Sequence, residues 1–140
     1  MNLNKSLIAQ RFAKATQSYT EQAVIQKQIG QHLCQLMQDN CPKHLSDVLE
    51  IGCGSGNLTY QLAKNFQIEQ WYLNDLYAAV QQHFQGNLPV HWMIGDIEEL
   101  ALPKNLNAIV SSSAVQWIND LPLLLARCHT ALSTQGWLCF

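Results

Sequence analysis

Apolar residues recur in two different periods along the chain, and the change between them falls near residue 40. Over residues 4–38, apolar positions come every three or four residues, with Gln and Lys between them. The clearest of these positions are Ile25, Ile29, Leu33 and Leu36. This spacing predicts helix, and a break near residues 16–20 divides it into two helices. Residues 40–46 contain Pro42 and are predicted to be a loop.

Beyond this loop, short apolar runs alternate with segments of helical spacing. The runs predicted to be strands are residues 47–51, 71–73, 90–94, 108–111 and 136–140. The segments predicted to be helices are residues 58–66, 77–84 and 121–132. Such alternation is typical of an α/β fold in which helices cover both faces of a parallel sheet. Ligands of these sheets bind beyond the carboxyl ends of the strands, so the loops there are the places to search for chemistry.

Length and composition limit the class of protein. The chain has 140 residues, 48% of them apolar, which suits one globular domain. A formal net charge of −2 provides no basic surface for nucleic acid. No run reaches the roughly 18 apolar residues that span a membrane, and residues 1–10 lack the apolar region of a secretory signal. The 5 cysteines form no C-x-x-C pair, which indicates reduced thiols in a cytoplasm, and the histidines show no metal-ligand spacing.

The most specific segment is residues 50–57, Glu-Ile-Gly-Cys-Gly-Ser-Gly-Asn, which follows a predicted strand and opens a helix. Closely spaced glycines permit positive φ and let a ligand approach the backbone, while the helix N-terminus offers free N–H groups. A dinucleotide fingerprint would need glycine in place of Asn57, and a phosphate-binding loop would need Gly-Lys-Ser/Thr. A nucleophile elbow at Ser55 would need glycines at 53 and 57. A glycine turn that only joins strand to helix stays open.

The remaining pattern, acidic-x-Gly-x-Gly-x-Gly, resembles motif I of the class I S-adenosylmethionine-dependent methyltransferases. The resemblance implies a Rossmann-like sheet in the order 3-2-1-4-5, with S-adenosylmethionine as cofactor. It also implies that Gly52, Gly54 and Gly56 bend around the methionine part of that cofactor. Glu50 starts the motif, where its carboxylate would attract the cofactor's ammonium, order a water molecule, or brace the loop.

Two further loops support this resemblance. Asp75 ends the second predicted strand, where a carboxylate can accept hydrogen bonds from both ribose hydroxyls, although a helix N-cap is the alternative. Asp96 and Ile97 follow the third strand in a Gly-Asp-aliphatic element like that of the family. There Asp96 would accept the adenine amino group and the Ile97 N–H would address a ring nitrogen, with Leu76 packing on the ring. A solvated acidic turn is the alternative for Asp96.

The loop after the fourth predicted strand carries a narrower resemblance. Its pattern Ser-x-x-Ala-Val-Gln-Trp, at residues 111–117, is similar to the family of biotin-synthesis methyltransferases that act on malonyl-acyl carrier protein. The helical pattern around Phe12, Tyr19, Ala23 and Gln26 agrees with it. The resemblance implies Tyr19 near the methionine end and Ser111 beside the cofactor. Ser111, Gln116 and Trp117 are also the acceptor-side candidates, against ordinary helix capping or packing. Asn107 departs from the Asp common in relatives.

The resemblance extends over essentially the whole chain and implies how it is organised. Residues 1–40 are expected to form a helical cap over the cofactor, and residues 41–140 the cofactor-binding core. The seven-stranded fold of the family implies further strands after residue 140. We therefore expect a C-terminally truncated chain with little turnover, which self-associates through the exposed edge of its last strand.

The implied reaction needs little from the protein beyond alignment. The acceptor would be the free carboxylate of malonyl-acyl carrier protein or malonyl-CoA, which is ionised at neutral pH with a free pKa of about 4 and needs no general base. No catalytic residue is therefore identified. Lys5, Arg11 and Lys14 are candidates for a basic face toward an acidic carrier protein. A different small acceptor, or a module that only binds S-adenosylmethionine, stays open.

Overall fold

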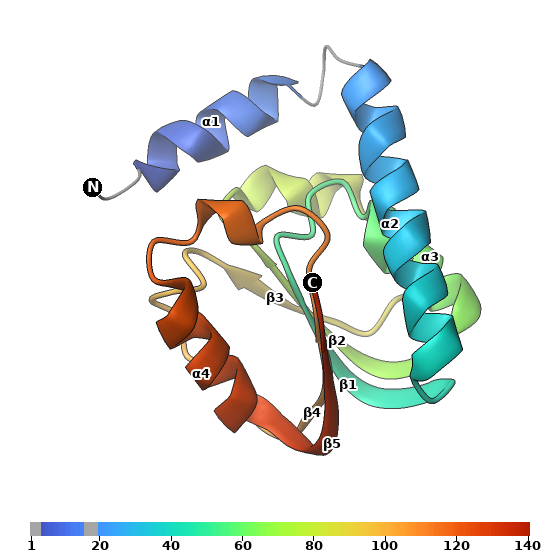
Figure 1. The fold of residues 1–140 in the computed structure, drawn as a ribbon. Coiled ribbons are helices and arrows are strands. Elements are labelled where there is room, and N and C mark those ends of the chain that lie inside the picture. The colour runs from blue at the N-terminus through green and yellow to red at the C-terminus, as the bar shows by residue number, and fades with distance from the viewer. Residues whose placement is uncertain (1–3, 16–19) are drawn as a thin grey trace.

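The computed structural model describes the backbone of residues 4–15 and 20–140, and the side chains of residues 4–11 and 21–140 (Figure 1). Its elements in chain order are α1 (Lys5–Ala15), α2 (Thr20–Asn40), β1 (His44–Ile51), α3 (Asn57–Asn65), β2 (Gln67–Asp75), the 3₁₀ helix η1 (Ala78–His83), β3 (Val90–Ile94), β4 (Leu106–Val110), the 3₁₀ helix η2 (Val115–Trp117), α4 (Leu121–Ala131) and β5 (Leu132–Cys139). No helix of these described ranges is long and apolar enough to cross a membrane.

The sheet confirms the expected architecture. Its five strands are parallel and stand in the order β3-β2-β1-β4-β5. Helices α2 and α3 cover one face and α4 covers the other, while α1 crosses above the ends of the strands (Figure 1). The order reverses direction at β1, and ligands of such sheets bind beyond the carboxyl ends of the strands at this point.

Two apolar clusters fill the two sides of the sheet, and β1 contributes to both. Val48 packs in the cluster beneath α2 and α3, whereas Leu49 and Ile51 pack in the cluster beneath α4. Because β1 is buried on both faces, it reads in the sequence as a continuous apolar run rather than an alternating one. Helix α2 joins the first cluster through Leu33 and Met37.

Strands β1 and β2 start earlier than predicted, because strand pairing extends beyond the apolar runs. The predicted loop 40–46 is wrong over its last three residues, since β1 begins at His44 and pairs there with Gln67 of β2. Strand β2 likewise starts at Gln67 instead of residue 71. Polar residues alternate in its first half, and only the neighbouring strand supplies their backbone partners.

The helix predicted over residues 77–84 is a 3₁₀ helix over Ala78–His83. Only Val80 in this segment is buried. A short segment with one buried side chain has no apolar stripe to stabilise a full α-helix, and short helical pieces commonly take the tighter 3₁₀ form.

The last two elements meet without a loop. Helix α4 runs from Leu121 to Ala131 and is capped by Asp120, whose side chain accepts a hydrogen bond from the Leu123 N–H at 3.1 Å. Strand β5 begins at the next residue, Leu132, instead of at residue 136 as predicted. The sheet register shifts between Leu106 and Ala108 to accommodate this early start.

Candidate cofactor site

Hydrogen bonds join the loops after β1, β2 and β3 into one surface at the carboxyl edge of the sheet. The Cys53 N–H donates to the Asn74 carbonyl at 2.9 Å, and the Gly54 N–H donates to Asp75 Oδ2 at 2.9 Å. The Gly95 N–H donates to the Asp75 carbonyl, also at 2.9 Å. Residues from three separate predicted motifs are therefore in direct contact.

The glycines of the first loop adopt the left-handed backbone that their spacing suggested. Gly52, Gly54 and Gly56 have φ values of 69°, 54° and 90°. A Cβ at Gly52 would lie 2.4 Å from the Ala114 Cβ, so this position requires glycine for packing as well. A Cβ at Gly54 would meet nothing within 4 Å, which leaves open space in front of this residue, beside Asp75.

Glu50 lies beneath the glycine turn and is only 1% exposed. Its Oε1 accepts a hydrogen bond from the Thr59 hydroxyl of α3 at 2.5 Å. Burial raises the pKa of Glu50 to about 8, with the Thr59 hydrogen bond opposing this rise and the nearby charge of Asp75 adding to it. In this structure Glu50 joins β1 to α3, and its predicted roles at the loop and toward a ligand stay predictions.

Asp75 is held in a fixed orientation at the end of β2. Its Oδ2 accepts from the Gly54 N–H and its Oδ1 accepts from the Tyr77 N–H at 3.1 Å. Burial raises the pKa of Asp75, and these backbone hydrogen bonds oppose the rise. Each carboxylate oxygen keeps a further lone pair, so Asp75 can accept two hydroxyl hydrogens without losing its own supports.

Asp96 and Ile97 lie on the loop after β3, where Ile97 is buried and Asp96 is partly exposed. Asp96 Oδ1 accepts hydrogen bonds from the Glu98 N–H at 2.9 Å and from Lys5 Nζ at 2.8 Å. Leu76, the remaining candidate for the adenine side, is half-buried.

The sequence suggested that Lys5 presents its charge to a carrier protein, but the structure pairs this charge within the chain. Its ammonium is paired with both Asp96 and Glu98, and its side chain is 11% exposed. The proposed basic face is wrong at this residue. Arg11 is exposed, and the side chain of Lys14 lies outside the described residues.

Ser111 is placed inside the sheet rather than at its surface. It is 2% exposed, and its hydroxyl donates to the Ile51 carbonyl at 2.9 Å. This hydrogen bond ties the end of β4 to the end of β1. The predicted contacts of Ser111 with cofactor and acceptor stay predictions.

The remaining candidates of the fourth loop lie on η2. Gln116 is exposed, and Trp117 is partly buried with its backbone N–H bonded to the Ala114 carbonyl at 3.1 Å. Ala114 also contacts the glycine turn at Gly52, so this loop approaches the first one. Tyr19 lies outside the described residues.

Several residues that position these loops carry no sequence signal. The Asn74 side chain, 3% exposed, donates to the carbonyls of Met93 and Gly95 and so joins β2 to β3. Glu98 and Arg127 hold the loop after β3. An isolated Asn, Glu or Arg of this kind is indistinguishable from a surface residue until its partner, distant in sequence, is known.

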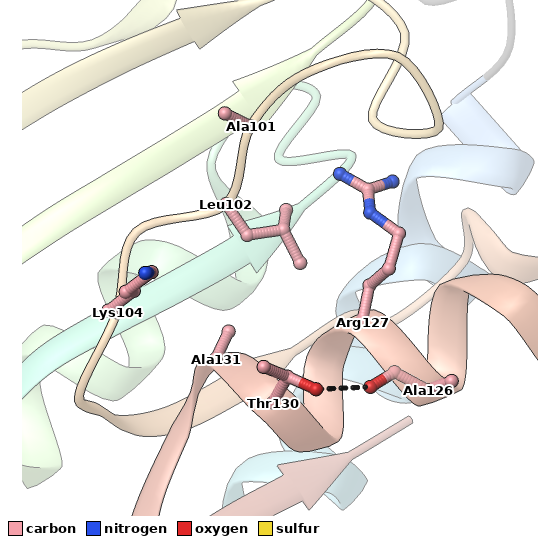
Figure 2. Close-up of a pocket in the computed structure, with 7 residues that line it drawn as sticks. All are labelled: Ala101, Leu102, Lys104, Ala126, Arg127, Thr130 and Ala131. Carbon is pink, nitrogen blue, oxygen red and sulfur yellow. Dashed lines mark hydrogen bonds between the residues drawn. The ribbon is translucent and has the colours of Figure 1, made fainter.

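Of two hollows in the described part of the chain, one is lined by a predicted site residue, Ser111. The first hollow, of about 360 Å³, lies between residues 101–104 and the second half of α4 and contains none of the predicted site residues (Figure 2). The other, of about 350 Å³, separates α2 from the ends of β4 and β5. It is lined by Gln28, Ile29, His32, Leu33, Leu36, Ser111, Ser112 and Phe140. Within the described residues, no group of three or more His, Cys, Asp or Glu is arranged to hold a metal ion.

The parallel sheet, the glycine turn and the two acidic loops at one edge define a class of α/β proteins built to hold a nucleoside-containing cofactor. Residues 48–136 match the methyltransferase domain family, and the chain belongs to that family.

Among particular relatives, the malonyl-[acyl-carrier protein] O-methyltransferase of Acinetobacter baylyi is 66% identical over 139 residues, which cover 99% of this chain and 54% of that protein. The enzyme of the same name from Haemophilus influenzae is 37% identical, over 98% of this chain and 54% of its own length. The chain thus spans about half the length of these curated relatives.

Solved structures agree on the fold. A SAM-dependent methyltransferase from Leishmania major superimposes with a TM-score of 0.64 at 21% identity, over 80% of this chain and 48% of that one. A phosphoethanolamine N-methyltransferase from Haemonchus contortus, in complex with S-adenosylhomocysteine, superimposes with a TM-score of 0.64 at 26% identity. The match covers 76% of this chain and 26% of that one.

Proposed function

We propose that this chain binds S-adenosylmethionine at the carboxyl ends of β1, β2 and β3. We further propose that it serves the transfer of the donor's methyl group to the free carboxylate of a malonyl thioester, an early step of biotin synthesis. The observation that carries the proposal is the contact between the three loops, in which Asp75 accepts from Gly54 and bonds through its carbonyl to Gly95. The names of the relatives support the acceptor.

The residues present fit this donor. The open space before Gly54 suits the methionine portion, beside a carboxylate that can accept ribose hydroxyls. Asp75 would hold the ribose, and Asp96 the amino group of adenine. Apolar Leu76 and Ile97 would pack against the base. Tyr19 and Ser111 remain candidates at the methionine end, and Glu50 would place a carboxyl group below it.

The proposed reaction requires the protein chiefly to align the donor's methyl group with the acceptor carboxylate. The donor supplies an electrophilic methyl on a sulfonium, and a malonyl carboxylate is already ionised, so no protein base has to take a proton. The chain's part is to hold the donor rigidly and exclude water near the η2 loop, where Gln116 and Trp117 are the acceptor-side candidates. Alignment of this kind lowers barriers by roughly 7–11 kcal/mol in favourable cases.

The same proposal covers partners and compartment. The acceptor would arrive as malonyl-acyl carrier protein or malonyl-CoA, and the compartment would be the cytoplasm, in line with five free thiols. Residues 1–40 would act as a helical cap over the core 41–140. Trp137, Leu138 and Phe140 are exposed on or beside the edge strand β5, which supports self-association there.

Calorimetric titration tests the cofactor. We expect binding of S-adenosylmethionine and S-adenosylhomocysteine, and no binding of NAD. Asp75→Ala should weaken binding by about tenfold or more, because a charged acceptor of two hydrogen bonds is lost. Asp75→Asn, which keeps one acceptor oxygen, should lose less. NAD binding, or unchanged affinity in Asp75→Ala, would contradict the proposal.

Methyl transfer tests the acceptor. Labelled S-adenosylmethionine is incubated with stoichiometric chain and malonyl-acyl carrier protein, so that even slow transfer yields detectable ester. Acetyl-acyl carrier protein, which lacks the free carboxylate, is the matched control and should stay unlabelled. Label in both would favour a different acceptor group.

A further inference from the structure

The carboxylate of Glu98 ties the loop after β3 to α1 and to the segment just before α4. On one side Glu98 accepts a hydrogen bond from Lys5 Nζ of α1. On the other it accepts the backbone N–H groups of Asn119 at 3.1 Å and Asp120 at 2.8 Å, just before α4. Burial alone would raise the pKa of Glu98, but the hydrogen bonds from Lys5 and from these two N–H groups lower it to about 2.

Arg127 of α4 holds the main chain of the same loop. Its Nη1 donates to the carbonyls of Ile97 at 3.0 Å and Glu98 at 3.1 Å, and its Nη2 donates to the carbonyl of Leu100. Figure 2 shows the guanidinium extending from α4 toward this loop. Arg127 therefore holds the backbone of the loop, whereas the hydrogen bonds of Lys5 go to side chains.

The two ligands of Lys5 include the carboxylate expected at the adenine. Lys5 Nζ and the Glu98 N–H both donate to Asp96 Oδ1. Within the described residues, no hydrogen bond reaches Asp96 Oδ2, so this oxygen is available to a ligand. The side chains of Lys5, Asp96 and Glu98 are 11%, 21% and 16% exposed, so water screens these ion pairs only partly.

We propose that Lys5 is a positioning residue for the base of the cofactor: it orients Asp96 through Oδ1, leaves Oδ2 to accept the adenine amino group, and ties α1 to this loop. The proposal rests on the proposed function for its adenine half. A carboxylate already held in its binding orientation loses less rotational freedom when the ligand arrives, which strengthens binding.

A pair of ligands separates orientation of Asp96 from simple stabilisation of α1. One is S-adenosylhomocysteine, and the other is its purine analogue, in which hydrogen replaces the amino group of the base. Lys5→Met keeps most of the length of the side chain and removes its charge. We expect this variant to weaken the binding of S-adenosylhomocysteine about three- to tenfold, the range for losing part of a charge-assisted hydrogen bond. The affinity for the purine analogue should change much less.

Two further variants complete the calorimetric experiment. Lys5→Arg, which restores a cation, should recover most of the selectivity for the amino group. Lys27→Met removes an exposed lysine from α2 and should leave both affinities unchanged. Equal weakening of the two ligands by Lys5→Met, or no weakening of either, overturns the orientation of Asp96 by Lys5.

Hydrogen exchange of the ligand-free chain judges the anchoring of α1 independently of the cofactor. Lys5→Met should accelerate exchange of the α1 amides at residues 8–11 and leave α3 unchanged. Unchanged exchange in α1 overturns the anchoring. If the wild-type chain binds neither ligand, the proposed function and the adenine half of this inference fail together, while the exchange result still decides whether Lys5 anchors α1.

Discussion

At the scale of single residues, the site combines groups that the motif predicts with partners that it does not. Gly52, Asp75 and Asp96 stand where the spacing of the loops after the strands placed them. The raised pKa of Glu50, the acidic residue of the motif, could not be predicted from the sequence. Glu50 is buried against α3 with one hydroxyl partner, so its proton affinity depends on packing rather than on sequence.

Glu50→Gln should make stability less dependent on pH. The carboxyl has an ordinary pKa of 4.5 when unfolded and about 8 when folded. Between these values the folded state keeps a proton that the unfolded state loses, so the contribution of Glu50 to stability is greatest below 4.5 and is lost as pH rises toward 8.

The difference in the free energy of unfolding between wild type and Glu50→Gln should therefore change by up to about 1.4 kcal/mol per pH unit between these two pKa values. The free energy of unfolding, measured in urea from pH 5 to 8, checks this, with exposed Glu99→Gln as control. Parallel curves for wild type and Glu50→Gln would show that Glu50 is ionised in the folded chain.

Gly52→Ala should destabilise the chain by about 2–4 kcal/mol, since it adds a left-handed alanine and a close contact with Ala114. Gly86→Ala shares the positive φ but meets nothing within 4 Å, and should cost about 1–2 kcal/mol. Adding Ala114→Gly to Gly52→Ala should recover the difference in denaturant unfolding. Equal losses for the two single variants would argue against the contact.

At the scale of elements, the side chain of one residue extends a strand pair beyond its ladder. Regular pairing of β1 with β4 starts at Val48 and Ala108. Before it, Asn107 Oδ1 accepts the N–H groups of Ser46 and Asp47, each at 2.9 Å, and also the Ser46 hydroxyl. Asn107, which stands where relatives commonly have Asp, therefore has a structural role, and its side-chain oxygen still accepts these hydrogen bonds.

Asn107→Leu should destabilise the chain by about 2–4 kcal/mol, because two backbone donors lose their partner. Asn107→Asp keeps the acceptor and should stay within about 1 kcal/mol of wild type. Amide exchange at Ser46 and Asp47 should accelerate in Asn107→Leu alone. Unchanged exchange at these amides would mean that water or another group replaces Asn107.

At the scale of the whole molecule, the sheet ends at β5 with apolar side chains in solvent. Trp137, Leu138 and Phe140 are 36%, 41% and 41% exposed. An edge strand with unpaired backbone groups and apolar side chains is a template for association between chains.

We expect the 140-residue chain to associate reversibly at micromolar concentrations in sedimentation velocity. Leu138→Lys should shift it toward monomer, because a charge on the edge opposes pairing. Thr134→Lys, at an exposed polar position of the same strand, is the matched control for added charge. A wild-type chain that is monomeric throughout would contradict the prediction.

The sequence by itself determined the α/β class, its parallel sheet and the three loops that gather at one edge, while the order of the strands came from the resemblance of the glycine motif to a known family. Glycine spacing and apolar periodicity are local properties, so they are legible in one dimension. Only the tertiary structure decided where β1 begins, that residues 78–83 form a 3₁₀ helix, and that Ser111 turns into the sheet. The same holds for Lys5, whose partners Asp96 and Glu98 stand 91 and 93 residues away. Pairing and burial depend on neighbours brought together by folding, and no local pattern records them.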